Sequence, residues 1–345
     1  MFAKKTVFIV GAGASAEVDL PMGDALKGRI GKAVGFTFPD NFNPKEGNLA
    51  IYWAVKEHLK QLDVRDSNPW WRAGQAIKAA MPQAISIDNF LHTHSHDENI
   101  IFMGKLGIAV CILEAERTSS LRGDKDRDGK LNYGSIKESW HATFVKMLLE
   151  NAQAKATDIL FDNVSFITFN YDRCIELYLE KALQNYLLIS EQEAQKAVNK
   201  LTVIHPYGQV GSLPWQPSGR VKFGAEPQAT ELLEIARQIR TFTERVEDEA
   251  MMARIHSLIA EAEQVIYLGF SYGTMNLELL TVASKAKRKS VVLGTTIGIS
   301  EPNRNVIASD IQNSIGPDYV SIGQIALPAL TCNDLLHQYW RVIAR

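Results

Sequence analysis

The amino-acid sequence predicts an α/β protein, and two observations support this prediction. Short runs of β-branched, aromatic and aliphatic residues are typical of strands buried on both faces of a parallel sheet. They lie at Thr6–Val10, Val164–Thr168, Leu201–Ile204, Val265–Leu268 and Ser290–Leu293. Helical patterns separate several of these runs, at Cys174–Leu188, about Ala229–Ala262 and Asn276–Ala286. Strand alternating with helix predicts a Rossmann-like, doubly wound, mostly parallel sheet.

The first predicted strand continues directly into a glycine loop. The segment Gly11-Ala12-Gly13-Ala14-Ser15-Ala16 matches the pattern Gly-x-Gly-x-x-Ala. One glycine allows a tight turn, a second lets backbone amides approach a pyrophosphate, and a small third residue lets the following helix pack closely on the strand. A phosphate would then sit at a helix N-terminus. We expect a dinucleotide site here, and a strand–helix turn without a ligand is the alternative.

The stretch between the first two predicted strands is different in character. Residues 24–155 contain helical patterns and four tryptophans, but few strand patterns. We expect a mostly helical insertion after the first βα unit, closing over one end of the sheet within a single domain of residues 1–345. No acidic residue ends a second strand about 20 residues after the glycine loop, where a dehydrogenase would bind the ribose.

Composition limits the classes of protein to which this chain can belong. The chain has 46% hydrophobic and 22% charged residues and a formal net charge of -2, without a long Lys/Arg run, which disfavours direct nucleic-acid binding. Its three cysteines, Cys111, Cys174 and Cys332, lie too far apart for a zinc ribbon and fit a reducing cytosol. No stretch approaches the ~20 apolar residues of a membrane span, and glycine interrupts the short N-terminal apolar run. We therefore expect a cytoplasmic protein that does not associate with membranes.

Two further motifs have a metal-binding interpretation and a simpler one. The segment Asp124–Gly129 begins like a calcium loop, but the twelfth position is Ser135 instead of glutamate, which favours a solvated turn. The alternating histidines His92, His94 and His96 would share one face of a strand. They follow an apparently helical segment, where alternate residues diverge, so we favour a polar surface or subunit contact over a metal site.

Polar motifs follow three more of the predicted strands. They are Thr168-Phe169-Asn170-Tyr171-Asp172, His205-Pro206-Tyr207-Gly208 and Gly269-Phe270-Ser271. The carboxyl ends of the strands are where open α/β sheets bind ligands. A simpler interpretation is that Asn170 or Asp172 caps the helix that begins at Cys174, and that His205 is a hydrogen-bonded structural histidine.

Together with Gly11–Ser15 and Leu20-Pro21-Met22-Gly23, these motifs resemble the sirtuin family, and more closely its bacterial sirtuin-like NAD hydrolases of anti-phage defence. Their order and intervals match that family over most of the sheet-forming sequence. The segment Ser86–Leu91 is also similar to one in the helical region of the defence enzymes. The resemblance implies a sirtuin-like catalytic domain that takes NAD as its substrate.

The resemblance also implies a role for each matching residue. Those expected to bind the cofactor are Gly11, Ala12, Gly13, Ala14, Ser15, Pro21, Thr168, Gly269 and Ser271. Gly269 and Ser271 would contact the adenosine half, while the catalytic residues Asn170, Asp172 and His205 would face the nicotinamide ribose. An asparagine amide can orient a water molecule, a histidine can accept a proton at neutral pH, and an aspartate can stabilise positive charge.

Departures from the deacylase sirtuins favour simple hydrolysis. The chain cannot build their four-cysteine zinc module, so we expect no zinc and no other metal. His205 is followed by Pro206-Tyr207 instead of glycine, and Gly294-Thr295-Thr296 stands where deacylases usually carry an asparagine. We expect an NAD glycohydrolase that depletes NAD in defence. A non-catalytic NAD or ADP-ribose sensor and, less favoured, a protein deacylase are the alternatives.

An activity that depletes NAD would kill its host unless it were controlled. The resemblance therefore implies control by assembly, either in a homo-oligomer or with a partner. The partner types that it suggests are a HerA-type ATPase, an Argonaute-like protein or a phage component.

Overall fold

A six-stranded sheet forms the centre of the structure, a computed structural model that describes residues 2–39, 43–123, 130–154, 156–242, 244, 248–282 and 285–344. The strands are β1 (Thr6–Val10), β2 (Val164–Thr168), β3 (Thr202–Ile204), β4 (Gln264–Leu268), β5 (Val291–Gly294) and β6 (Ile325–Ala326). Their order is β3-β2-β1-β4-β5-β6, and all neighbours pair in parallel. The predicted strands are confirmed. The prediction missed β6, because two residues are too few to show a period.

The strand order reverses at β1. Both β2 and β4 pair with β1 along its whole length, so that Thr6 lies beside Val164 on one side and Gln264 on the other. In open α/β sheets, ligands bind outside the carboxyl ends of the strands at such a reversal. The loops that follow β1 and β4 therefore face the crevice where this topology places a ligand.

Helices cover both faces of the sheet. On one face the core includes Phe8 and Val10 of β1, and on the other it includes Val7 and Ile9, so β1 is buried on both sides. The first face is covered by α7 (Trp140–Leu149), α8 (Cys174–Leu187), α9 (Glu191–Val198), α15 (Cys332–Gln338) and α16 (Trp340–Ile343). The second is covered by α12 (Glu249–Glu261), α13 (Thr274–Leu279) and α14 (Glu301–Ile315). The doubly wound α/β fold is confirmed.

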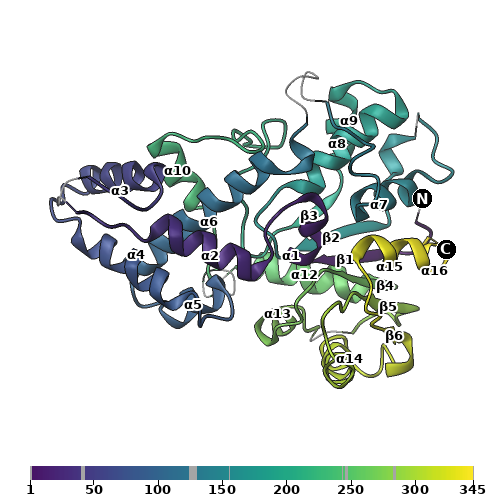
Figure 1. The fold of residues 1–345 in the computed structure, drawn as a ribbon. Helices are drawn as coiled ribbons and strands as arrows, with labels where there is room; N and C mark the ends of the chain where they lie inside the picture. Colours follow the sequence, from purple (N-terminus) through teal and green to yellow (C-terminus); the bar gives the residue numbers. More distant parts are fainter. Residues whose placement is uncertain are drawn as a thin grey trace.

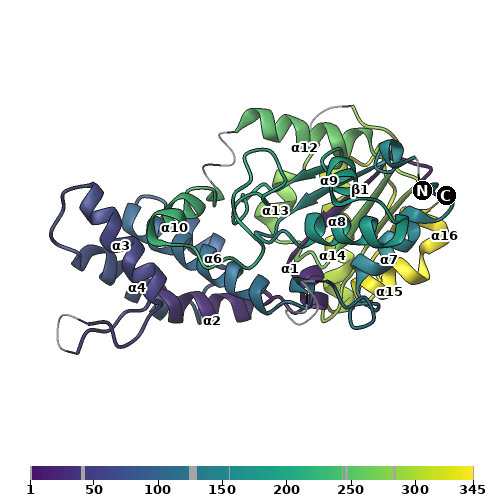
Figure 2. The same ribbon diagram turned by 90° about the horizontal axis from the view of Figure 1, so that it is seen from above.

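A helical lobe lies at one end of the elongated molecule, opposite the two termini (Figures 1 and 2). It consists of α2 (Gly23–Val34), α3 (Leu49–Gln61), α4 (Asn68–Ala80), α5 (Ile87–Thr93), α6 (Glu98–Thr118) and α10 (Ala229–Ala236). Its core also contains Tyr171 and Tyr207, which follow β2 and β3, so the lobe joins the sheet at the carboxyl edge. Although α7 lies within residues 24–155, it packs on the sheet, and α10 joins the lobe from outside that range. The boundaries of the insertion and the single-domain organisation stay predictions.

Two predicted helices have the wrong extent. The long helix expected at Ala229–Ala262 is divided into α10 and α12, because the Asp248 side chain caps a new helix by accepting from the Met251 amide at 3.0 Å. The helix expected at Asn276–Ala286 ends at Leu279. In both regions apolar periodicity continues across the break. None of the helices in the described part of the chain has the length and apolar character that a bilayer crossing requires.

Candidate functional site

The glycine loop leads into only one turn of α-helix, α1 (Ala12–Ser15), followed by a 3-10 turn at Ala16–Val18. The Gly13 amide donates to the Gly269 carbonyl at 3.0 Å, and the Ala14 amide donates to the Gly11 carbonyl at 3.0 Å. Two of the loop amides expected to receive a pyrophosphate are thus already bonded to protein carbonyls. A one-turn helix also contributes a much smaller dipole than a long one.

Glycine is needed in this loop for close contact between two backbones. A Cβ atom on Gly11 would lie 2.6 Å from the Gly269 carbonyl oxygen, and one on Gly13 would lie 2.9 Å from the Gly269 Cα. Gly269 itself has a φ of +58°, a left-handed conformation that favours glycine. Its amide donates to the Thr295 hydroxyl at 2.8 Å, which ties the loop after β4 to the residue after β5. The two predicted glycine motifs therefore meet directly at the strand-order reversal.

A short hydrogen-bonded network joins the glycine loop to the motif after β2. Asn170 Nδ2 donates to the Gly11 carbonyl at 3.1 Å and to Ser15 Oγ at 2.8 Å. Ser15 Oγ in turn donates to Asp172 Oδ2 at 2.8 Å. The other oxygen of Asp172 accepts from the Cys174 amide at 3.1 Å and so caps the start of α8. Asp172 therefore has the capping contact of the simpler interpretation and a contact with the glycine loop as well.

The network orients the Asn170 amide. Because the Gly11 carbonyl can only accept, the nitrogen of the Asn170 side chain must face it, and Oδ1 faces the other way. Oδ1 has no hydrogen-bond donor among the residues that the structure describes, although Asn170 is only 8% exposed. An oriented acceptor at the carboxyl edge of β2 can bind a water molecule or a ribose hydroxyl.

His205 follows β3, and its ring contacts two groups of the protein. Nδ1 lies 3.0 Å from the Asn170 main-chain carbonyl oxygen, and Nε2 lies 3.1 Å from Oε1 of Glu176 on α8. Burial is the largest single influence on the pKa of His205 and lowers it, but Glu176, the Asn170 carbonyl and the charge of Asp172 together raise the pKa above its usual value. Both ring nitrogens are engaged within the protein, and the role of His205 as a proton acceptor stays a prediction.

Of the three remaining predicted residues, Thr168 joins the network and the other two lie apart from it. Thr168 ends β2, and its hydroxyl accepts from the Asn170 amide at 3.3 Å. Pro21 is half-buried just before α2, and Ser271 is exposed beyond the β4 loop. The hydrogen bonds described above connect neither Pro21 nor Ser271 to the Asn170 network. The structure thus brings together Gly11–Ser15, Thr168, Asn170, Asp172, His205 and Gly269.

Sequence reasoning missed several residues next to this cluster. Glu176 contacts His205, Trp140 Nε1 donates to the Ala14 carbonyl at 3.0 Å, and the Tyr171 hydroxyl donates to Asp88 of α5. A buried stripe of α8 carries Glu176 among apolar residues, one turn after Asp172. An acidic residue on the apolar side of a predicted helix was the signal that could have identified it. The other two contacts join residues too distant in sequence for any local pattern to show.

The histidine motif does not form a strand. His92 lies in the last turn of α5, with its ring 4.8 Å from that of Phe242, and the ring of His94 lies 4.2 Å from that of Phe90. No group of three or more histidine, cysteine, aspartate or glutamate side chains in the described ranges could hold a metal ion. Residues Asp124–Gly129 lie outside the described residues.

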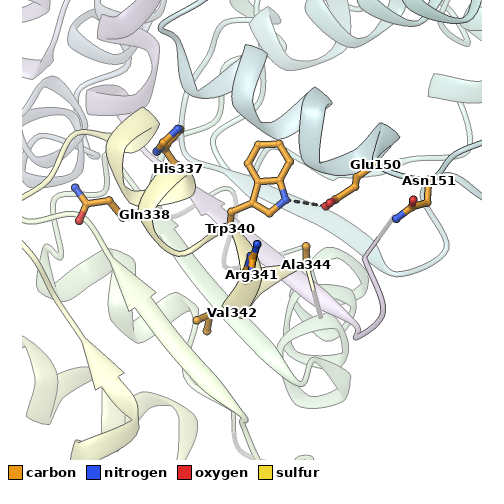
Figure 3. Close-up of a pocket in the computed structure, with 8 residues that line it drawn as sticks. All are labelled: Glu150, Asn151, His337, Gln338, Trp340, Arg341, Val342 and Ala344. Atoms are coloured by element: carbon orange, nitrogen blue, oxygen red, sulfur yellow. Dashed lines mark hydrogen bonds between the residues drawn. The ribbon is translucent and has the colours of Figure 1, made fainter.

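A separate pocket of about 650 Å³ lies near the chain termini. Its lining residues are Glu150, Asn151, His337, Gln338, Trp340, Arg341, Val342 and Ala344, and Figure 3 shows the Trp340 indole pointing toward Glu150. The indole nitrogen donates to Glu150 at 2.7 Å. The Val342 carbonyl accepts from Gln264, the first residue of β4. This pocket is therefore at the amino edge of the sheet, opposite the Asn170 network.

The fold and the cluster define a doubly wound α/β protein with polar side chains gathered at the reversal of its strand order. A scan against protein-family models finds no match, and a search of curated proteins finds none either. Among solved structures, the chain is similar to Sir2 in complex with the inhibitor EX-527, 2'-O-acetyl-ADP-ribose and a deacetylated p53 peptide. That similarity has 13% sequence identity and a TM-score of 0.35, and it covers 98% of this chain and 93% of the other.

Proposed function

We propose that this chain is an NAD glycohydrolase that cleaves NAD to nicotinamide and ADP-ribose. The observation that carries the proposal is the orientation of Asn170, whose amide nitrogen is held by Gly11 and Ser15 while Oδ1 remains available. The motifs that resemble the sirtuin-like NAD hydrolases contribute the same residues. The position of the cluster beside the strand-order reversal also supports a dinucleotide ligand.

Cleavage of NAD by water would require little of the protein beyond positioning the reacting groups. As the bond between nicotinamide and ribose breaks, nicotinamide leaves with the bonding electron pair and the ribose carbon acquires oxocarbenium character. Asn170 Oδ1 would orient a water molecule whose oxygen forms the new bond to that carbon while a proton is released. The Asp172 carboxylate, held by Ser15, would stabilise the developing positive charge or bind a ribose hydroxyl.

The first test is nicotinamide release from NAD by the purified chain and by Asn170→Ala. We expect the substitution to lower the rate by about 100-fold or more, as for loss of a group that acts on the transition state. Asn163→Ala is a matched control, because Asn163 lies at the opposite end of β2, where its amide donates to the Phe2 carbonyl at 3.0 Å. Equal rates in wild type and folded Asn170→Ala would show that Asn170 has no part in cleavage.

The alternative is a non-catalytic sensor, which would bind its ligand at the same glycine loop and strand ends. A sensor would bind NAD or ADP-ribose without releasing nicotinamide, and calorimetry beside the release assay separates the two functions. A deacylase would release nicotinamide only with an acylated peptide. We disfavour it because Cys111, Cys174 and Cys332 are all buried as free thiols and cannot form a four-cysteine zinc module.

We further propose a role in anti-phage defence, with control by assembly in a homo-oligomer or with a HerA-type ATPase, an Argonaute-like protein or a phage component. These proposals rest on the motif resemblance. Nicotinamide release measured with and without each candidate partner, over a range of chain concentrations, tests them. A rate that no partner and no concentration changes would contradict control by assembly.

A further inference from the structure

Glu176 is a buried carboxyl group with an incomplete set of hydrogen bonds. It lies in the first turn of α8 and is 3% exposed. One oxygen lies 3.1 Å from His205 Nε2, and the other, Oε2, is buried without a hydrogen-bond partner among the described residues. Leaving a buried polar atom unpaired is costly, so such an atom in a folded protein calls for an explanation.

The hydrogen bonds to the His205 ring determine how many protons His205 and Glu176 hold between them. The Asn170 main-chain carbonyl can only accept, so the Nδ1 atom beside it must carry a hydrogen. The contact between Nε2 and Glu176 then requires one more proton, either on the ring or on the carboxyl group. His205 and Glu176 therefore share one proton between Nε2 and Oε1.

We propose that Glu176 is a positioning residue of the candidate site, which shares a proton with His205 and, through that ring, holds the main chain of Asn170. Asn170 is then fixed from two sides. Gly11 and Ser15 hold its side chain, while His205 holds its carbonyl. Only the catalytic consequence of this inference rests on the proposed NAD cleavage; the shared proton does not.

The charged groups that act on the His205 ring are Glu176 and, from the segment before α8, Asp172. Both favour the imidazolium form, and together with the hydrogen bond to the Asn170 carbonyl they exceed the opposing effect of burial. Of the two, Glu176 makes the direct contact, while Asp172 bonds to Ser15 and to the Cys174 amide. Removing the charge of Glu176 should therefore change the titration of His205.

The test is an NMR titration of His205 in the wild type and in Glu176→Gln. Glutamine keeps the size of the side chain and can donate to a neutral Nε2, but it cannot share a proton. We expect the His205 transition to move to lower pH. Glu180→Gln is the matched control, because Glu180 lies one turn further along α8, is 1% exposed and bonds to Gln184 instead of the ring. An unchanged His205 titration in Glu176→Gln would overturn the inference.

Nicotinamide release supplies a second, separable measurement. We expect Glu176→Gln to lower kcat about tenfold or more, with little change in KM, and to alter the pH dependence of kcat. Glu176→Asp should recover part of kcat and part of its pH dependence. If the wild type cleaves no NAD, alone or with the candidate partners, but the titration shifts, the proposed function fails and the positioning role stands. If the wild type cleaves NAD while Glu176→Gln changes neither titration nor rate, the positioning role alone fails. If Glu176→Gln does not fold, Glu176→Asp serves for the titration, because its shorter side chain withdraws the carboxylate from Nε2. We then expect a smaller shift of the His205 transition to lower pH, and no shift would overturn the inference.

Discussion

At the scale of single residues, burial changes what a side chain can do. His141, on α7, lies between the rings of Trp140 and Tyr178, and neither of its ring nitrogens has a hydrogen-bond partner among the described residues. Burial lowers the pKa of His141 to about 3. The His205 side chain is also mostly buried, yet Glu176 raises its pKa. The two histidines differ because only one has a carboxylate partner.

His141 should make the protein less stable in acid. Its folded pKa, about 3, lies below the unfolded value of about 6.5, so the unfolded state binds more protons between these limits. Stability from the neutral ring is present above pH ~6.5 and is lost as pH falls, by up to about 1.4 kcal/mol per unit. Urea unfolding at pH 7.5 and 5.0 should show about 2 kcal/mol less acid destabilisation in His141→Phe than in wild type. If wild type and His141→Phe lost equal unfolding free energy on acidification, this effect would be excluded.

At the scale of elements, distant side chains complete the helix ends. Glu17 accepts from the Trp140 amide at 2.6 Å and from the Asn333 amide at 3.0 Å, so one carboxylate serves the first turns of both α7 and α15. Lys289 has the corresponding role at the C-terminal end of α12, where it donates hydrogen bonds. The last carbonyls of a helix have no partner within the helix. These contacts fix the helices to the sheet that carries the candidate site.

Replacing Lys289 should destabilise the protein through α12. Its ammonium group is buried and donates to the carbonyls of Ile259 at 2.8 Å, Ala260 at 3.2 Å and Ala262 at 2.7 Å. We expect Lys289→Met to cost roughly 2–4 kcal/mol, because it leaves buried carbonyls unsatisfied. Chemical denaturation measures the change, and the exposed Lys287→Met is the control, expected to lie within about 0.5 kcal/mol of wild type. A similar small change in both variants would contradict this role.

At the scale of the whole molecule, one buried ion pair joins the helical lobe to the sheet. Glu116 of α6 pairs with Arg173, the residue before α8, and both side chains are fully buried. Arg173 also donates to the carbonyls of Gly211 and Val221, and Glu116 accepts from the Gly224 amide at 2.9 Å. Lobe, sheet and the loop after β3 meet at this pair, and Arg173 directly follows the Asn170–Asp172 motif in the chain.

Removing one partner of the Glu116–Arg173 pair should therefore strongly destabilise the folded protein. We expect Glu116→Ala to cost about 3–5 kcal/mol, because it leaves a buried guanidinium without its counter-charge. The exposed pair between Lys5 and Glu261 provides the comparison, and Lys5→Ala should change stability by less than about 1 kcal/mol. Thermal and urea unfolding of both variants measure the difference. Comparable losses of unfolding free energy in Glu116→Ala and Lys5→Ala would show that burial does not increase the contribution of an ion pair to stability.

The sequence by itself determined the strands, because each is a short, continuous run of apolar and β-branched residues. Thr6–Val10 and Val164–Thr168 were predicted with the bounds that the structure has, since each strand is buried on both faces. The glycine loop and the polar motifs at the strand ends could also be identified, because each is a short contiguous segment. Their common location followed from the shared direction of parallel strands.

Only the tertiary structure decided how these segments meet. Strand order placed β4 beside β1, so that Gly269 contacts Gly11, a residue far away in the sequence. It also placed Glu176 against His205 and divided the long helical pattern between α10 and α12. Local periodicity reports which residues are buried, but it is the same whichever partner buries them. The choice of partner depends on packing across the whole chain, and at this site it determines which polar groups are bonded and which remain available to a ligand.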